Sequence, residues 1–335
     1  MSPPQLTSGD VLADRRAGYA RMLLDSGDAA AAADLQRQAL DLAPGWAAGW
    51  HELGLYREAA KDLAGAAEAW RQVLVIEPAD MFGAGMKLAL VGHAAIPAVP
   101  PSEYVAQLFD DYSDRFDTAL VEALHYVVPE RLTAMIADAA GPGARFAKVI
   151  DLGCGTGLFG ERIRGVTSWL EGYDLSQGML AKAAEKGVYD ELGQADILYG
   201  IEAARQPGAS QANLVAAADV FAYFGDLDPV MAVAAGLTVD QGLMALSLEA
   251  GPDDCDWVLQ TSLRYCHGET YLRRLLDSHG FTLVSLSREP IRRDGSNQIT
   301  GLLVVARKRS PAAVKPPETA VALSGDAIPV PSAPN

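Results

Sequence analysis

The sequence predicts an α/β protein with a doubly wound, mainly parallel sheet, preceded by an all-α module of helical repeats. Three observations support this fold class. β-rich and helix-like runs alternate between residues 102 and 309, a pattern typical of a parallel sheet covered by helices. One β-rich run leads into a glycine-rich loop at 153–157, and prolines recur at a spacing of 34 residues within residues 1–95.

Length and charge limit the classes of function. The chain has 335 residues, enough for about two domains. It carries 27 Lys and Arg against 43 Asp and Glu, a formal charge of −16. An acidic chain lacks the basic face that binds nucleic acid or an anionic membrane surface. We therefore expect neither as a partner.

Cysteine usage and the apolar segments indicate the compartment. The three cysteines, at 154, 255 and 266, form no disulfide framework and no metal-ligand spacing. The N-terminus lacks the basic and apolar runs of a signal peptide. The most apolar segment, 214–224, is too short to span a bilayer. We expect a reduced, cytoplasmic protein without a metal or a membrane span.

Residues 1–95 are predicted to form helical hairpins. Pro44 and Pro78 lie 34 residues apart, and each ends a helix-like run. Ala32 and Ala66 keep the same spacing, at positions where two helices approach closely. An unrelated pair of alanine-rich hairpins would give a similar pattern.

The second unit resembles the tetratricopeptide repeat, whose period is about 34 residues. The matching residues are Trp50, Leu53, Gly54, Ala66, Trp70 and Pro78. The first unit departs from that pattern at Arg16 and Gln36, where aromatic residues are usual. Met81–Val91 is expected to open a third, incomplete unit. The resemblance leaves open whether this module holds a protein or peptide partner.

Two segments are predicted to lie outside the folded units. Residues 96–101 contain three prolines, which favours an extended, semi-rigid linker. Residues 310–335 hold six prolines and no apolar periodicity, so we expect a disordered tail. The remaining range, 102–309, is predicted to be one large domain.

The strands of that domain determine where a ligand would bind. Strands are expected at 148–152, 169–174, 213–218, 243–249, 283–288 and 302–307, with a helix at about 177–186. Sheets of this kind bind ligands beyond the carboxyl ends of their strands, at the point where the strand order reverses.

Acidic residues and glycines are found at these strand ends. Asp151 ends the first strand and is followed by Gly153, Gly155 and Gly157. Glycines permit a tight turn and a close approach of backbone N–H groups to a ligand. Asp174 ends the next strand, 23 residues after Asp151, where a carboxylate can accept both hydroxyls of a ribose.

This ordered set resembles the class I S-adenosylmethionine-dependent methyltransferases, over residues 102–309. Its strongest likeness is to bacterial predicted methyltransferases that carry an N-terminal tetratricopeptide region. The stretches that carry the likeness are Phe109–Tyr112 with Arg115–Asp117, Gly178–Leu180, Asp219–Leu227 and Arg264–His267. The resemblance implies a Rossmann-like seven-stranded methyltransferase sheet with an antiparallel last strand, and methyl transfer from the sulfonium of S-adenosylmethionine.

The resemblance also implies a cofactor site. Asp151 would receive the methionine ammonium, Asp174 the ribose and Asp196 the adenine amine. Leu175 and Met179 would line the adenine, and Asp219 would lie beside the reacting end. The full predicted set is Asp151, Gly153, Cys154, Gly155, Gly157, Asp174, Leu175, Met179, Asp196, Ile197, Ala218 and Asp219. Cys154 is expected as a small apolar filler of the loop rather than as a nucleophile.

Four residues are candidates for the acceptor side: Tyr112, Tyr223, Tyr265 and His267. The sulfonium is a good leaving group, so positioning and desolvation can supply much of the acceleration. A general base is needed only for an acceptor that is protonated at the working pH. The ordinary pKa of histidine suits that role, although His267 fits a structural role equally well. Tyr112 lies in an aromatic helix, 109–116, that could cover the cofactor.

Other readings remain open at this point. Gly155–Gly160 is a GxGxxG with Asp174 placed 19 residues after Gly155, close to a dinucleotide fingerprint. That reading leaves Asp196 and the stretch 219–227 unexplained. The acceptor is expected to be a small molecule. The alternatives are methylation of a protein or peptide, or a non-catalytic assembly protein that uses the repeat module.

Overall fold

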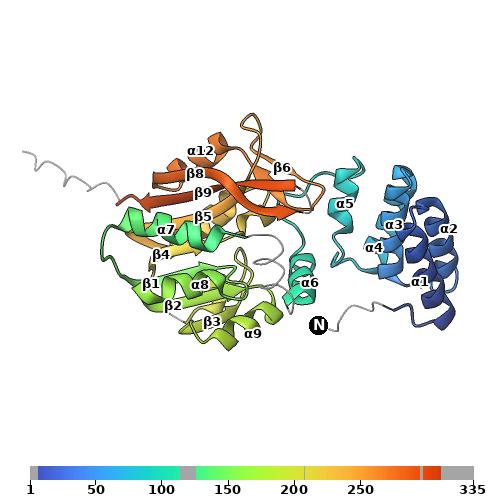
Figure 1. Ribbon diagram of the computed structural model, residues 1–335, viewed down its shortest axis with the longest axis horizontal. Coiled ribbons are helices and arrows are strands. Elements are labelled where there is room, and N and C mark those ends of the chain that lie inside the picture. Colours follow the sequence, from blue (N-terminus) through green and yellow to red (C-terminus); the bar gives the residue numbers. More distant parts are fainter. Residues whose placement is uncertain (1–6, 114–125, 207, 295–296, 311–335) are drawn as a thin grey trace, which may run out of the picture.

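The computed structural model describes residues 7–113, 126–206, 208–294 and 297–310. Its N-terminal helices form one part and an α/β domain forms the other, and helix α6 (Ser102–Tyr112) of the α/β domain lies on the side that faces the N-terminal helices (Figure 1). The predicted lid residue Phe116, the stretch 115–117 and the tail from 311 onward lie outside the described residues.

The N-terminal part consists of two helical hairpins and one further helix. These are α1 (Val11–Asp25), α2 (Ala29–Leu40), α3 (Ala47–Ala59), α4 (Leu63–Ile76) and α5 (Ala84–Leu90). Helices α3 and α4 approach closely at Gly54, where a Cβ would lie 2.2 Å from Nε1 of the fully buried Trp70. The helix expected over Met81–Val91 is present as α5.

The α/β domain contains one nine-stranded sheet and seven helices in the described residues. The strands are β1 (Phe146–Leu152), β2 (Thr167–Asp174), β3 (Glu191–Gln194), β4 (Ala212–Ala217), β5 (Thr238–Ala250), β6 (Trp257–Leu259), β7 (Tyr265–His267), β8 (Phe281–Asp294) and β9 (Asn297–Lys308). The helices are α6 (Ser102–Tyr112), α7 (Val128–Ala140), α8 (Leu158–Ile163), α9 (Gln177–Lys186), α10 (Ile201–Ala204), α11 (Asp228–Leu237) and α12 (Glu269–Ser278).

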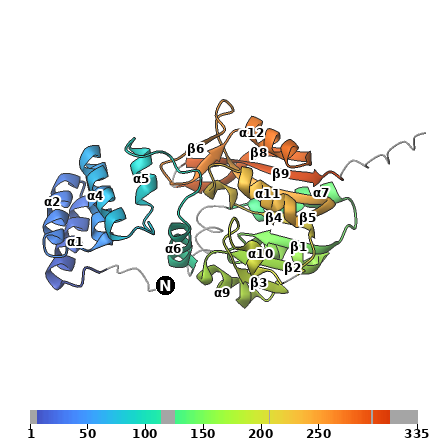
Figure 2. The same cartoon turned by 180° about the vertical axis from the view of Figure 1, so that it is seen from behind.

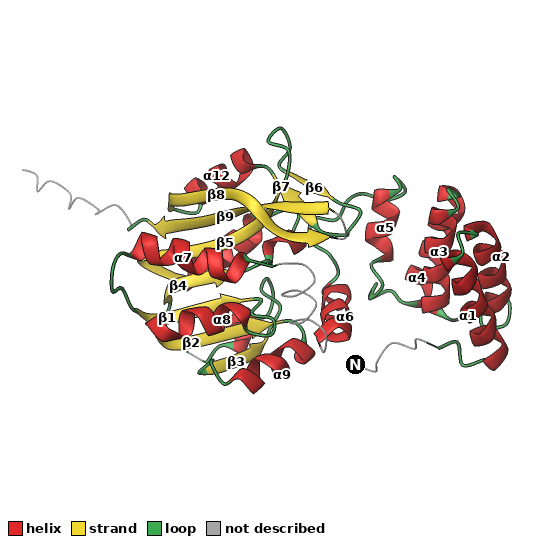
Figure 3. Ribbon diagram, viewed as in Figure 1, coloured by secondary structure: helices red, strands yellow, loops and turns green. Residues whose placement is uncertain are grey.

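Strands β3, β2, β1, β4 and β5 lie side by side and parallel. Strand β9 pairs antiparallel with β5 along Leu243–Glu249, and β8 pairs antiparallel with β9. Seven of the nine strands, in the order β3-β2-β1-β4-β5-β9-β8, therefore form the expected methyltransferase-like sheet, in which the last strand in the sequence, β9, is antiparallel (Figure 3). All six predicted strands are present, whereas the short strands β3, β6 and β7 were not predicted.

The β6–β7 hairpin lies over the carboxyl ends of the sheet. Glu249 of β5 pairs with Gly301 of β9 and also with Cys266 of β7, so β9 and β7 flank opposite edges of β5. Strand β7 therefore pairs with β5 on the same side as β4, beyond the residue at which β4 ends. Its residues contact the 3-10 turn Phe221–Tyr223, which follows β4.

Helices cover both faces of the sheet. Helices α7 and α8 pack on the face seen in Figure 1, through Leu132, Ile136, Phe159 and Ile163. Helices α10, α11 and α12 pack on the opposite face, where α10 and α11 stand in front in Figure 2. Because both faces are covered, the carboxyl edge of the parallel strands is the part of the sheet open to a ligand.

Helix α5 of the N-terminal part and the linker after it both contact the α/β domain. Met86 and Ala89 of α5 are buried in one cluster with Leu259, Leu263 and Tyr265 of the hairpin region. In the linker, the carbonyl of Ala98 accepts hydrogen bonds from the backbone N–H groups of residues 225 and 226. The domain boundaries at 95 and 101 stay predictions.

None of the helices in the described ranges has both the length and the apolar character to cross a membrane.

Candidate functional site

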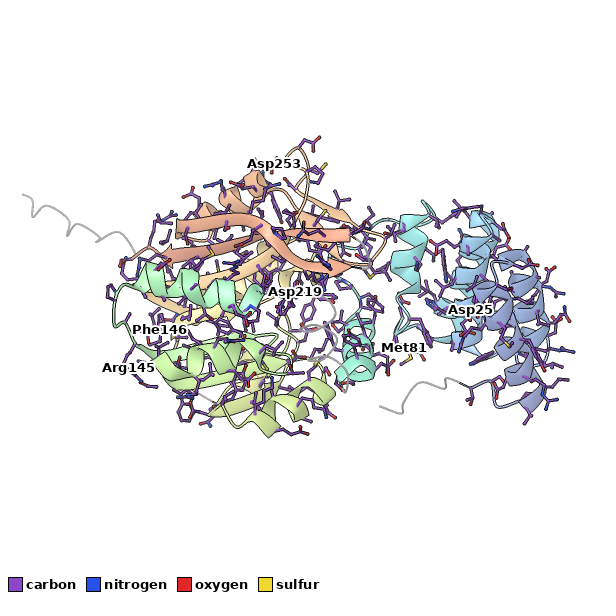
Figure 4. All side chains as sticks on the ribbon, viewed as in Figure 1. Asp25, Met81, Arg145, Phe146, Asp219 and Asp253 are labelled. Carbon is purple, nitrogen blue, oxygen red and sulfur yellow. The ribbon has the colours of Figure 1, made fainter. Side chains whose placement is uncertain are left out.

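A cavity of about 360 Å³ opens at the carboxyl ends of β1, β2 and β4, within the size range of small-molecule sites. Helix α6 and the linker residues Val99 and Pro100 form the wall opposite the sheet. Asp219, which follows β4, lies between the sheet and α6 (Figure 4). The cavity therefore occupies the place that the sequence predicts for a ligand.

The loop after β1 needs its glycines. Gly153 has φ +64°, and a Cβ there would lie 2.4 Å from Cγ2 of Val220. Gly157 has φ +90° and precedes the first residue of α8. Side chains at these positions would be strained, so the loop can take this close turn only with glycine. The turn exposes the backbone of residues 153–156 to the cavity.

Asp151 lies at the base of this loop with 1% of its surface exposed. The hydroxyl of Tyr189 donates a hydrogen bond to Oδ2 of Asp151 at 2.7 Å. Burial raises the pKa of Asp151 to about 7. The effect of burial on this pKa is larger than the opposite effect of the Tyr189 hydrogen bond, which lowers it. Among the described residues, the groups that act on Asp151 are Tyr189 and Asp174, and neither is cationic. A cation that entered the cavity would therefore favour its ionised form.

Asp174 connects the loop to the next helix. Its Oδ2 accepts from the N–H of Gly155 at 2.8 Å, and its Oδ1 accepts from the N–H of Ser176 at 2.9 Å. Burial raises the pKa of Asp174 to about 6, against the effect of these hydrogen bonds. Each carboxylate oxygen has a second lone pair, so Asp174 can still accept from hydroxyls in the cavity.

Asp196 is more constrained than the sequence suggested. Its Oδ1 accepts from the N–H of Leu198 at 2.8 Å, and its Oδ2 accepts from the hydroxyl of Ser102 at 2.6 Å. Its carboxylate thus holds its own turn and the start of α6. Contact with an adenine amine would share or displace the Ser102 hydrogen bond.

Helix α6 covers the cavity from the side opposite the sheet. Val105, Leu108, Phe109 and Tyr112 contribute to the lining. Near its C-terminal end, Oδ1 of Asp110 accepts hydrogen bonds from the Ser176 hydroxyl and the Gly178 N–H, at 2.5 and 3.0 Å. Helix α6 is therefore attached to the segment that follows β2.

A buried ion network stands at the other end of the cavity. Arg264 donates from Nε to Glu249 at 2.5 Å, from Nη2 to Asp219 at 2.6 Å and from Nη1 to the Tyr223 hydroxyl at 2.7 Å. Arg292 of β8 donates to the same Glu249 oxygen at 2.5 Å. The paired guanidinium groups lower the pKa of Glu249 despite its burial. Arg264 comes from the turn of the β6–β7 hairpin.

Asp219 has an unusual backbone conformation, with φ +63°. Its N–H donates to the hydroxyl of Ser247 at 2.8 Å. A non-glycine residue with positive φ is uncommon and such residues concentrate at functional sites. Here the conformation places the carboxylate against Arg264.

The cavity brings together most of the predicted site residues. The predicted residues that line it are Asp151, Gly153, Cys154, Gly155, Asp174, Leu175, Asp196, Ile197, Ala218, Asp219, Tyr112 and Tyr223. Gly157 and Met179 are not part of the lining. Gly157 turns the chain into α8, and Met179 is fully buried in the first turn of α9. Burial raises the pKa of the Cys154 thiol well above its ordinary value, which disfavours a nucleophilic thiolate.

Tyr265 and His267 do not line the cavity. The Tyr265 hydroxyl donates to the carbonyl of Pro97 at 2.7 Å. Nε2 of the fully buried His267 lies 2.8 Å from the carbonyl of Phe224 and 3.1 Å from that of Gly225. Both neighbours are acceptors, which assigns the proton to Nε2. Burial lowers the pKa of His267 to about 4. Both contacts are structural, and the predicted catalytic roles gain no support from them.

Sequence reasoning missed several residues of the site. Arg292, Tyr126 and Tyr189 were not predicted, and Asp110 and Arg264 were noted only within the stretches that carry the family resemblance. Tyr189 lies outside any motif, so no sequence signal could identify it. Arg292 lies four residues beyond the strand expected at 283–288, and the structure extends that strand to include it, as part of β8.

The chain is similar in sequence to a repeat-containing protein over a short stretch. No family model matches the sequence. The TPR repeat-containing protein PA0015 of Pseudomonas aeruginosa is 46% identical over 59 residues, 18% of this chain. The chain spans 56% of that relative's length.

Solved structures resemble the α/β part at low sequence identity. Magnesium protoporphyrin IX methyltransferase from Synechocystis PCC 6803, with bound SAH, is 15% identical, with a TM-score of 0.41 over 62% of this chain and 86% of that chain. The DhpI–SAH complex is 16% identical, with a TM-score of 0.46 over 63% and 98%.

The strand order decides the fold. Five parallel strands in the order β3-β2-β1-β4-β5 are followed by the antiparallel β9 and then β8. This strand order is typical of the methyltransferase type of Rossmann fold. The α/β domain has the S-adenosylmethionine-dependent methyltransferase fold. An N-terminal helical region precedes this fold.

Proposed function

We propose that this chain transfers a methyl group from S-adenosylmethionine to a small-molecule acceptor. One observation carries the proposal: a single cavity joins the residues suited to that cofactor with a separate polar end suited to an acceptor. Asp151, Asp174 and Asp196 line the first part, and Asp219, Tyr223 and Arg264 line the second.

The first part of the cavity suits the polar groups of the cofactor. Asp151 is a buried acid with no cationic partner among the described side chains, and the methionine ammonium would supply one. Asp174 would accept from the ribose hydroxyls, while Leu175 and Ile197 supply apolar walls for the adenine. The bound cofactor supplies an electrophilic methyl group. The protein's own residues bind it, orient it and exclude water.

The small-molecule acceptor is favoured by how the cavity is covered. Helix α6 and linker residues Val99 and Pro100 form its outer wall, and α6 is fixed at both ends by hydrogen bonds from Ser102 and to Asp110. A folded protein substrate would have to displace this cover. A separate proposal is that the N-terminal helical region binds a protein or peptide partner. The resemblance to tetratricopeptide repeats is what supports it.

The test uses methyl-labelled S-adenosylmethionine with the full chain and a cell extract divided into fractions below and above about 1 kDa. We expect the label to enter the small-molecule fraction, and the Asp174→Ala variant to transfer much less. Asp138→Ala, an exposed change on α7, is the matched control. Label confined to proteins would favour the peptide alternative. No transfer in either fraction, with the cofactor still bound, would favour a non-catalytic role.

A further inference from the structure

We propose that the acceptor is an acid, and that Arg292 binds its oxyanion at the end of the cavity beside Asp219. This inference rests on the proposed function, because it names the chemical class of acceptor for the same cavity. Carboxylates and phosphate groups share the oxyanion chemistry that a guanidinium recognises.

Arg292 keeps donor capacity toward the cavity. It is nearly buried, with 9% of its side chain exposed, and it lines the cavity. Its Nη2 donates to Glu249 at 2.5 Å, but its Nη1 lies 3.4 Å from Asp219, longer than an ordinary hydrogen bond. Its Nε forms no hydrogen bond within the described ranges. Since a guanidinium has five N–H donors, several of them remain for a ligand.

Arg264 is committed to the protein in a way that Arg292 is not. Each of its three nitrogens donates to a different group, on Glu249, Tyr223 and Asp219. Its guanidinium also lies over the Tyr223 ring, 4.6 Å from the centroid. Arg264 therefore provides a fixed positive charge beside the more available Arg292.

Cationic groups outnumber the carboxylate among the side chains that line this end of the cavity. Arg264, Arg292 and Asp219 line it, whereas Glu249, which neutralises the pair from behind, is 2% exposed and does not line it. An incoming ligand meets two guanidinium groups and one carboxylate. An oxyanion that replaces the long Arg292–Asp219 contact gains a charge-assisted hydrogen bond.

Tyr126 adds an uncharged donor to the same place. It is 8% exposed and lines the cavity, and its hydroxyl forms no hydrogen bond in the described part of the molecule. Asp219, Arg264 and Arg292 all lie within electrostatic range of it. Burial raises the pKa of Tyr126 well above its ordinary value, so the phenol stays protonated and can donate to the anion.

Aromatic probes suit this cavity, because Phe109, Tyr112 and Leu158 contribute apolar lining. The test titrates the full chain, saturated with S-adenosylhomocysteine, with benzoate, phenyl phosphate, benzyl alcohol and benzylamine. We expect the two anions to bind and the neutral and cationic probes to bind at least tenfold more weakly. Tighter binding of benzoate indicates a carboxylate acceptor, and tighter binding of phenyl phosphate indicates a phosphate-type acceptor.

Variants show whether the anions use the proposed residues. Arg292→Gln should weaken anion binding at least tenfold, and Tyr126→Phe, which leaves the ion network intact, should weaken it severalfold. Arg288→Gln, on the same strand but exposed to solvent, is the matched control and should change nothing. The affinity for S-adenosylhomocysteine is measured first in each variant and should be unchanged, which shows that the fold is intact.

Three results would overturn the inference. In the first, all four probes bind equally well. In the second, the affinity for the anions is unchanged in both Arg292→Gln and Tyr126→Phe. In the third, neither anion binds to the protein saturated with S-adenosylhomocysteine. Failure of the wild-type chain to bind S-adenosylhomocysteine is a different result. It would contradict the proposed function itself, and this inference with it.

Discussion

The hydroxyl of Tyr189 donates a hydrogen bond to the buried carboxylate of Asp151 at 2.7 Å. Tyr189 is an uncharged partner, and the pKa of Asp151 is raised to about 7 by burial. The loop at 153–157 begins two residues after Asp151, and a Cβ at Gly157 would lie 3.0 Å from the Tyr189 ring. The free protein thus holds an acid at the base of its cavity that is half protonated near neutral pH. A cationic ligand group would complete the arrangement.

The first prediction follows from this pair. Below pH 7 Asp151 is largely neutral, and the ammonium of S-adenosylhomocysteine favours its ionised form, so binding releases a proton. Affinity should therefore rise with pH by up to about tenfold per unit below pH 7, and level off above it. Calorimetric titrations at pH 5.5, 6.5 and 7.5 measure this dependence.

Asp151→Asn is the control for the pH dependence, because asparagine keeps an oxygen that can accept from Tyr189 but does not ionise. The variant should bind more weakly at pH 7.5 and keep only the dependence due to Asp174, whose pKa is about 6. A wild-type affinity that is the same at all three pH values would count against the role given to Asp151.

The second prediction concerns Asp174. Removing its carboxylate in Asp174→Ala deletes charge-assisted hydrogen bonds worth roughly 1.5–3 kcal/mol. The affinity for S-adenosylhomocysteine should fall about 10- to 100-fold. Part of this loss comes from the loop, since Asp174 also accepts from the Gly155 N–H. Asp138→Ala should bind like the wild type, and an unchanged affinity in Asp174→Ala would remove the ribose assignment.

The third prediction separates a structural histidine from a catalytic one. His267 has a pKa lowered to about 4 by burial, so it stays neutral from pH 5 to 8. Its ring N–H bonds to the carbonyls of Phe224 and Gly225. His267→Ala should lower the free energy of unfolding by about 1–3 kcal/mol, measured by urea denaturation. The pH profile of methyl transfer should keep its wild-type shape. A profile that loses an ionisation between pH 5 and 8 would restore the predicted general base.

The fourth prediction concerns the link between the two parts. Met86 and Ala89 of α5 are buried against the hairpin residues Leu259 and Leu263, and the hairpin turn carries Arg264 into the cavity. A fragment that begins at Asp80 keeps α5, and one that begins at Ser102 loses it. We expect the longer fragment to unfold at a higher temperature and to bind S-adenosylhomocysteine more tightly. Equal stability and affinity would show that the boundary at 101 separates independent units.

The sheet was predictable because its strands have strong local patterns. An apolar run that ends near Asp151 predicts the first strand, and a second run that ends in Asp174 predicts the next. Strand β3 was missed because it has four residues at the edge of the sheet and none of them is fully buried. Strands β6 and β7 have three residues each, too few for any periodicity.

The residues proposed to bind the cofactor were easier to identify from the sequence than those proposed to bind the acceptor, for a physical reason. The proposed cofactor residues lie at strand ends and in one local loop, close in sequence to their motif. The acceptor end joins Asp219, Glu249, Arg264 and Arg292, which come from four separate segments. Their contacts depend on the β6–β7 hairpin and on the register shift of β8 between Pro290 and Arg292. Likewise, His267 ended in the interior because the short strand β7 pairs with the end of β5.

Calorimetric titration of the full chain with S-adenosylhomocysteine, beside an identical titration with NADH, tests the central claim most directly. We expect S-adenosylhomocysteine to bind with one site per chain and NADH to give no measurable heat of binding. Binding of NADH without S-adenosylhomocysteine would support the dinucleotide fingerprint at Gly155–Gly160 and contradict the methyltransferase assignment.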